Sequence, residues 1–183
     1  RYTGDIWQYL PARPYVKSLA AVAECLWYTG EFEESLETYE KLLKLNPGDH
    51  AEVRYMLVNC YLAMGLLKKA GALLQRFNYE PSCVWAWSKV LLNYLTKGPK
   101  SKKTRRALVD ALETNHNVLA YLLGFKKIPS EESPDEFEYG SEEEARDYVS
   151  LSHEAWLLNE KALDWLLEEL KSASGNHMTN LDM

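Results

Sequence analysis

The chain has 183 residues, which is enough for one domain or a short repeat array with its own core. Hydrophobic residues make up 46% of it and aromatic residues 12%, a composition typical of a packed protein and not of a disordered one. The net charge of −6 disfavours nucleic acid and anionic membrane surfaces as partners, because both repel an acidic protein.

One stretch of the otherwise acidic chain is strongly basic. Its cations are Lys97, Lys100, Lys102, Lys103, Arg105 and Arg106. Such a stretch is most often a solvated turn and helix face, although its charge also suits phosphate or an acidic peptide. We interpret it as solvated surface.

The cysteines predict no covalent or metal framework. Cys25, Cys60 and Cys83 form no CxxC pair, and an odd thiol would remain after oxidation. We therefore expect no zinc site, no disulfide framework and a reducing, cytoplasmic setting. No apolar stretch reaches the roughly 20 residues that cross a bilayer, so this segment is expected to contain no membrane span.

Three glycines recur at the interval of a helical repeat. Gly30, Gly65 and Gly98 each follow an apolar helical pattern and lie 35 and 33 residues apart, and Pro47 and Pro81 lie 34 residues apart. This is the period of the tetratricopeptide repeat, in which two antiparallel helices meet at a turn. Glycine suits that turn because it adopts left-handed backbone angles without strain. The predicted fold is all-α: a right-handed superhelix of antiparallel helix pairs, or tetratricopeptide-like α-solenoid, with a C-terminal capping helix pair.

The helices can be placed in chain order. Expected helices cover residues 14–29, 31–45, 50–64, 66–77 and 82–97, then a helix ending near 115, a short one over 117–123, one after 141 and one over 159–171. Ser141 is the expected N-cap of the eighth, with Glu144 at the capping-box position. We divide the chain into an N-terminal extension (1–12), tetratricopeptide-like repeats (13–124), an acidic connector (125–140), C-terminal capping helices (141–171) and a flexible tail (172–183).

Two blocks are more distinctive than the repeat. The first contains Gly4-Asp5-Ile6-Trp7 and Ala12-Arg13-Pro14-Tyr15, and the second includes Asn115, Tyr121, Gly124, Tyr139-Gly140, Glu144-Ala145, Tyr148 and Trp156. In these blocks the chain resembles the suppressor of tumorigenicity seven-like family, which includes bacterial tetratricopeptide-like proteins of unassigned role. The resemblance extends from Gly4 to about Leu170. It implies a helical repeat without assigned catalysis and supplies no catalytic residue.

No residues have the spacing of an active site. His50, His116, His153 and His177 are scattered, without a second metal ligand at i+3 or i+4. Residues 98–104 contain lysines and a threonine but lack the GxxxxGK phosphate loop and a preceding strand. We predict a protein that is not an enzyme and has no metal site and no cofactor.

In tetratricopeptide arrays, the first helices of successive units line a groove that accepts an extended peptide or a partner helix. The predicted groove residues are Lys17, Glu24 and Trp27 of the first unit, Glu52, Tyr55 and Asn59 of the second, and Trp85 and Ser88 of the third. Their aromatic and amide groups suit a peptide. We therefore predict a noncatalytic protein- or peptide-binding scaffold.

Two alternatives stay open. The chain begins at Arg1 and not at Met, as a fragment would, so it is also consistent with a structural module of a larger enzyme or assembly. An RNA-binding helical repeat that uses the basic stretch is less favoured. The sequence indicates neither the oligomeric state nor whether residues 1–10 fill the groove.

Overall fold

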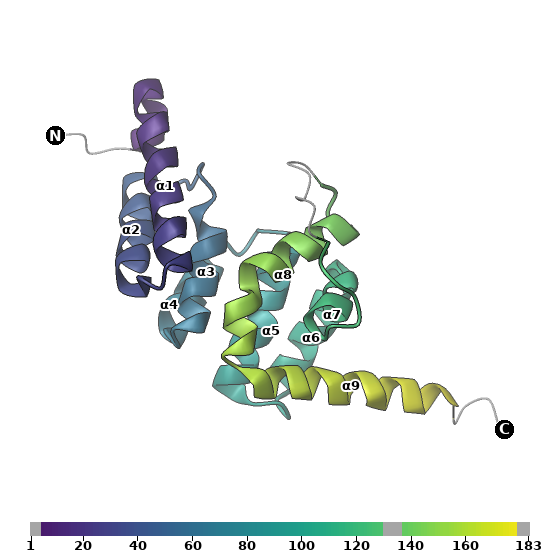
Figure 1. The fold of residues 1–183 in the computed structure, drawn as a ribbon. Helices are drawn as coiled ribbons and strands as arrows, with labels where there is room; N and C mark the ends of the chain where they lie inside the picture. The colour runs from purple at the N-terminus through teal and green to yellow at the C-terminus, as the bar shows by residue number, and fades with distance from the viewer. Residues whose placement is uncertain (1–4, 130–136, 179–183) are drawn as a thin grey trace. The chain divides into compact units, whose positions relative to one another are not determined.

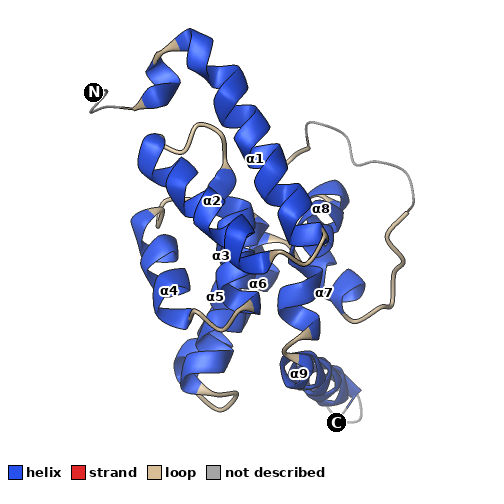
Figure 2. Ribbon diagram, turned by 60° about the vertical axis from the view of Figure 1, so that its left-hand side comes forward, coloured by secondary structure: helices blue, strands red, loops and turns tan. Residues whose placement is uncertain are grey.

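The computed structural model describes residues 5–129 and 137–178, and the described residues contain helices and no strand (Figures 1 and 2). The helices are η1 (Ile6–Gln8), η2 (Leu10–Ala12), α1 (Arg13–Tyr28), α2 (Phe32–Leu45), α3 (Val53–Ala63), α4 (Leu67–Arg76), α5 (Cys83–Lys97), α6 (Lys102–Thr114), α7 (Asn117–Leu122), α8 (Glu142–Leu157) and α9 (Glu160–Met178). The predicted all-α fold class is confirmed. Part of the expected connector, residues 130–136, and the last part of the expected tail, residues 179–183, lie outside the described residues.

The chain divides into two compact units at a boundary inside α3. Unit 1 comprises residues 1–61, with α1, α2 and most of α3, and unit 2 comprises residues 62–183. Each unit has its own buried apolar side chains, as expected when helices bury one face against a neighbour.

In unit 1, α1 and α2 form a helical hairpin, and the two helices lie side by side at the purple end of the chain in Figure 1. Val16, Ala23 and Trp27 form the buried face of α1. The Ser35 hydroxyl of α2 is fully buried and donates a hydrogen bond to the Ala23 carbonyl at 2.6 Å. A small side chain at this point allows the two backbones to approach closely.

The repeat period reflects a backbone requirement at the turns. Gly30, Gly65 and Gly98 have φ angles of +89°, +69° and +81°, in the left-handed region that favours glycine. Each ends the first helix of a pair, so the glycine spacing marks successive helix pairs.

In unit 2, α5 is the central helix, because α4, α6 and α8 all pack on it, and Figure 1 shows α8 directly over α5. The indole N–H of Trp85 donates to the Leu74 carbonyl of α4 at 3.3 Å. On the side of α8, the rings of Trp87 and Trp156 meet edge to face, with centroids 6.5 Å apart. The Tyr94 hydroxyl donates to the Lys161 carbonyl at the start of α9 at 2.8 Å.

A buried carboxylate joins three segments of unit 2. Glu144 of α8 is only 2% exposed, and its Oε1 accepts the backbone N–H of Cys83 at 2.9 Å. Its Oε2 accepts the backbone N–H of Gly140 at 2.8 Å and the side-chain amide of Asn115 at 2.9 Å. The Ser141 hydroxyl accepts the Glu144 N–H, as expected for an N-cap, but the Glu144 side chain turns inward toward these other donors.

The C-terminal helix is longer than expected. The sequence predicts that this helix ends near Lys171, whereas α9 continues to Met178. Leu166 and Trp165 hold its first half in the core, and a helix so anchored propagates through a polar continuation. No described helix is both long enough and apolar enough to cross a membrane.

We predict that Glu144→Ala lowers the free energy of unfolding by about 3 kcal/mol, because three hydrogen-bond donors, two of them in fully buried bonds, lose a charged acceptor. Urea unfolding followed by circular dichroism measures the change. Glu143→Ala is the matched control, since the Glu143 side chain is 42% exposed and pairs at the surface with Arg146; we expect less than about 0.5 kcal/mol for it. Equal effects of the two substitutions would refute the assigned role of Glu144.

Candidate functional site

The predicted groove residues of α1 divide between the surface and the core. Lys17 and Glu24 are exposed and lie seven residues apart, hence on one face of the helix. Trp27 is only 4% exposed and packs edge to face on Phe32, with ring centroids 4.7 Å apart. Lys17 and Glu24 are therefore accessible to a partner, whereas Trp27 contributes mainly to the α1–α2 hairpin.

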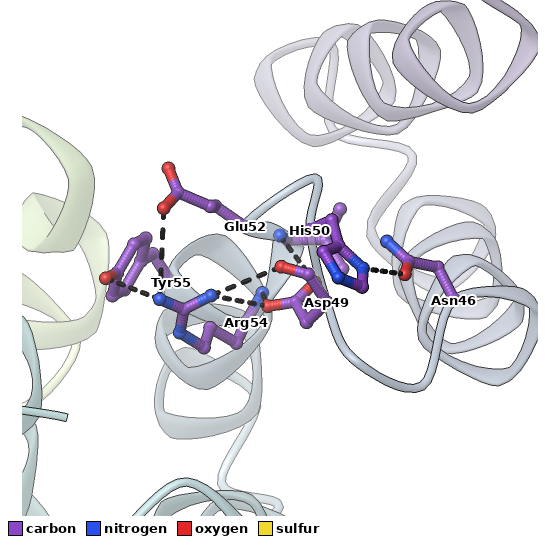
Figure 3. Close-up of polar contacts among 7 residues, drawn as sticks. Asn46, Asp49, His50, Glu52, Arg54 and Tyr55 are labelled. Atoms are coloured by element: carbon purple, nitrogen blue, oxygen red, sulfur yellow. Dashed lines mark hydrogen bonds and ion pairs between the residues drawn. The ribbon is translucent and has the colours of Figure 1, made fainter. Parts of the chain in front are cut away.

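The loop between α2 and α3 positions the residues of the second repeat (Figure 3). Asp49 is buried with a φ of +53°, and its two carboxylate oxygens accept the backbone N–H groups of Val53 and Arg54, both at 3.0 Å. The Arg54 guanidinium pairs with Asp49 Oδ2 at 3.1 Å and donates to the Tyr55 hydroxyl at 2.7 Å. It also lies 4.2 Å from the centroid of the Tyr55 ring. Asp49 and Arg54 together fix the start of α3 and the orientation of Tyr55.

The electrostatics of this loop are a balance between burial and pairing. Burial raises the pKa of Asp49, and the hydrogen bonds and charge of Arg54 act in the opposite direction. Glu52 lies at the outer edge with its side chain 66% exposed, and its carboxylate is 3.9 Å from Arg54. Glu52 is thus the accessible acidic group of the loop, while Asp49 is an internal one.

The same loop holds the N-terminal segment of unit 1. Asn46 is buried and lies 2.9 Å from His50 Nδ1, and its amide nitrogen fits best toward Asp5 Oδ1, also at 2.9 Å. His50 stacks on Trp7, with ring centroids 5.9 Å apart and planes 5° apart. The Arg13 guanidinium lies 5.0 Å from the Trp7 ring centroid. Trp7 therefore packs on the α2–α3 loop and the start of α1, within unit 1.

Asn59 is more enclosed than a groove residue would be. It is 4% exposed, and its side-chain amide donates to the Tyr55 carbonyl one turn earlier at 3.0 Å. Its Oδ1 is buried and accepts no hydrogen bond from the described residues. A ligand would reach this oxygen only if α3 became more exposed.

Trp85 and Ser88 of the third unit are fully buried. The Trp85 indole bonds to α4 and packs edge to face on Phe77, with ring centroids 6.3 Å apart. Ser88 lies beside Tyr148 of α8, and burial raises the pKa of that tyrosine. These positions pack unit 2 together, because α4 and α8 cover the face of α5 that we expected to line the groove.

Unit 2 has an open pocket on another face of the α5–α6 hairpin, and the sequence prediction did not identify it as a site. The pocket has a volume of about 510 Å³. Its lining residues are Glu80, Pro81, Ser82, Ala86, Lys89, Asn93, Lys102, Lys103, Arg106, Ala107, Asp110 and Thr114. The basic stretch in the sequence already contains three of the cations that line this pocket. Only the fold shows that Lys89 joins them and that the surface is concave.

The described residues offer little for metal binding or for nucleophilic attack by the Cys83 thiol. They contain no group of three or more His, Cys, Asp or Glu side chains that could hold a metal ion. Burial, and then the nearby Glu144 carboxylate, raise the pKa of the Cys83 thiol, which disfavours the nucleophilic thiolate.

Comparison with known proteins identifies the repeat. Residues 26–78 match the tetratricopeptide repeat family, over α2, α3, α4 and the end of α1. No curated protein and no solved structure gives a significant match. Together with the all-helical fold, this match confirms the predicted tetratricopeptide-like α-solenoid class, and it places a tetratricopeptide repeat at residues 26–78.

We predict that Asp49→Ala lowers the free energy of unfolding by about 3 kcal/mol. The substitution removes the cap of α3 and the ion pair between Asp49 and Arg54, and it places alanine at a positive φ. Urea unfolding monitored by circular dichroism tests this. Asp110→Ala removes another Asp–Arg pair, but that side chain is 50% exposed and its partner Arg106 lies on the same helix. We expect a change within about 0.5 kcal/mol for this control, and a similar loss in both variants would contradict the role given to Asp49.

Proposed function

We propose that this chain is a noncatalytic scaffold that binds a protein or peptide through the first-helix face of unit 1. The observation that carries the proposal is the tetratricopeptide repeat match over residues 26–78. Such repeats generally mediate protein–protein interaction, because their paired helices bury one face and leave the other for a partner. The proposed binding residues are Lys17, Glu24, Glu52 and Tyr55.

The side chains at these positions support the proposal. Lys17, Glu24 and Glu52 are exposed, so they can exchange water for polar groups of a partner. Tyr55 is half-buried, and the hydrogen bond and ring contact from Arg54 hold its phenol in one orientation. A tyrosine that is already ordered loses little conformational entropy on binding, which makes it a suitable anchor.

Two finer proposals accompany this one. The three cysteines are free, and Cys60 and Cys83 are buried, which supports a reducing, cytoplasmic setting. A relationship to the suppressor of tumorigenicity seven-like family is supported by the roles of its matching residues, since Asn115, Gly140 and Glu144 meet in one buried hydrogen-bond network.

Site-specific photo-crosslinking tests the proposed function. We expect a benzophenone amino acid at Lys17, Glu24 or Glu52 to crosslink a discrete partner protein in a lysate of the native cells, identified by mass spectrometry. The same group at Glu37 or Lys41, which are exposed on α2, serves as the control. We expect no adduct with that partner from the α2 positions.

Confirmation requires loss of the adduct when the same face is altered. Tyr55→Ala, combined with the crosslinker at Lys17, should reduce the yield severalfold while the helical circular dichroism signal is retained. Adducts of equal yield from α1 and α2, or none from either helix, would exclude the first-helix face as the binding surface.

A further inference from the structure

The pocket in unit 2 lies along one seam of the α5–α6 hairpin. On the α5 side, the N-cap residue Ser82 and the helical residues Ala86, Lys89 and Asn93 are spaced by four, three and four and so share one helical face. The pocket residues of α6 run from Lys102 in the first turn to Thr114 at the end of the helix. Both walls and the preceding Glu80–Ser82 turn belong to unit 2, so the pocket is defined within that unit.

The charge of the pocket is opposite to that of the chain. It is lined by four cations, Lys89, Lys102, Lys103 and Arg106, and by two carboxylates, Glu80 and Asp110, whereas the whole chain carries −6. Arg106 is already paired with Asp110 at 2.9 Å. Among the described residues, no ion pair is found for Lys89, Lys102 or Lys103, and these three ammonium groups line a concave surface.

The charges are also separated along the pocket. Because α5 and α6 are joined by a short turn and run in opposite directions, the first turn of α6 lies beside the second half of α5. Lys102 and Lys103 therefore lie toward the α5–α6 turn, and Glu80 lies toward the opposite end, near Thr114. The partial positive charge of the α6 N-terminus adds to the positive end.

We propose that this pocket binds a carboxylate-rich peptide segment of a partner protein, and this inference rests on the proposed scaffold function. Glu or Asp side chains of the segment pair with Lys89, Lys102 and Lys103. Asn93, Ser82 and Thr114 offer hydrogen bonds to peptide groups, and Ala86 and Ala107 give room for the backbone to approach. The volume of about 510 Å³ lies within the range of ligand pockets.

The same features disfavour RNA as the occupant. A nucleic-acid strand needs cations along its whole length, because every nucleotide carries a phosphate. Here Lys102 and Lys103 lie at one end, Asp110 is already paired with Arg106, and Glu80 would repel a phosphate backbone at the other end.

Fluorescence anisotropy on the full chain tests the proposal. The probe is a fluorescein-labelled peptide of alternating Glu and Gly, and the reference probes are the same peptide with Gln in place of Glu and a labelled oligouridylate. We expect the Glu peptide to bind with a Kd that rises with salt, and the Gln peptide to bind much more weakly.

Variants from the same basic stretch locate the binding. Lys102→Gln with Lys103→Gln should raise the Kd of the Glu peptide about fivefold or more, as the loss of two ion pairs predicts. Lys97→Gln with Lys100→Gln removes the same charge from exposed positions outside the pocket lining, and should change the Kd less than about twofold. Lys89→Gln probes the opposite wall and should also weaken binding. Circular dichroism checks that each variant keeps its helices.

Three outcomes would overturn the proposal: no binding of the Glu peptide, equal weakening by the two double variants, or tighter binding of oligouridylate than of the Glu peptide. The second would indicate a diffuse basic surface, and the third an RNA site. If the Glu peptide fails to bind but a partner is still crosslinked from α1, the pocket proposal is wrong and the scaffold function remains supported. If the Glu peptide binds but no partner is crosslinked from α1, recognition is restricted to unit 2.

Discussion

Unit 2 depends on one buried carboxylate. A desolvated carboxylate is stable only when its oxygens accept several hydrogen bonds, and Glu144 meets this condition with donors from Cys83, Asn115 and Gly140. These donors belong to the start of α5, the α6–α7 junction and the segment before α8, so satisfying one charge fixes three segments together. The contact of Trp87 with Trp156 follows from this placement.

The placement of α8 decides which part of α5 is open to a partner. With α8 on one side and α4 holding Trp85, the seam facing α6 through Lys89 and Asn93 is left concave. Lysines are tolerated there because their ammonium groups stay hydrated, whereas full burial would require a counter-charge. The recognition surface proposed for unit 2 is thus a consequence of how the C-terminal helices pack.

Unit 1 solves a similar problem in the α2–α3 loop. Asp49 sits at a positive φ that costs energy for a residue other than glycine, and its carboxylate offsets that cost by capping α3 and pairing with Arg54. Arg54 then orders Tyr55. The loop that terminates one repeat therefore also prepares the aromatic group that the next repeat presents.

The sequence by itself determined the helix pairs, their period and many of their ends. Turn glycines such as Gly30 and caps such as Ser141 depend on backbone angles and hydrogen bonds within a few residues, so their positions can be predicted locally. Helical spacing also showed which residues share a face, including Lys17 with Glu24. It did not show which neighbouring helix covers that face. For this reason Ser88 is predicted as a groove residue, whereas the structure buries it in the core. Only the tertiary structure decided which side chains are buried and where the cationic pocket opens, because both depend on contacts between distant residues. Cys83 and Glu144, for example, are some sixty positions apart and are joined by a hydrogen bond.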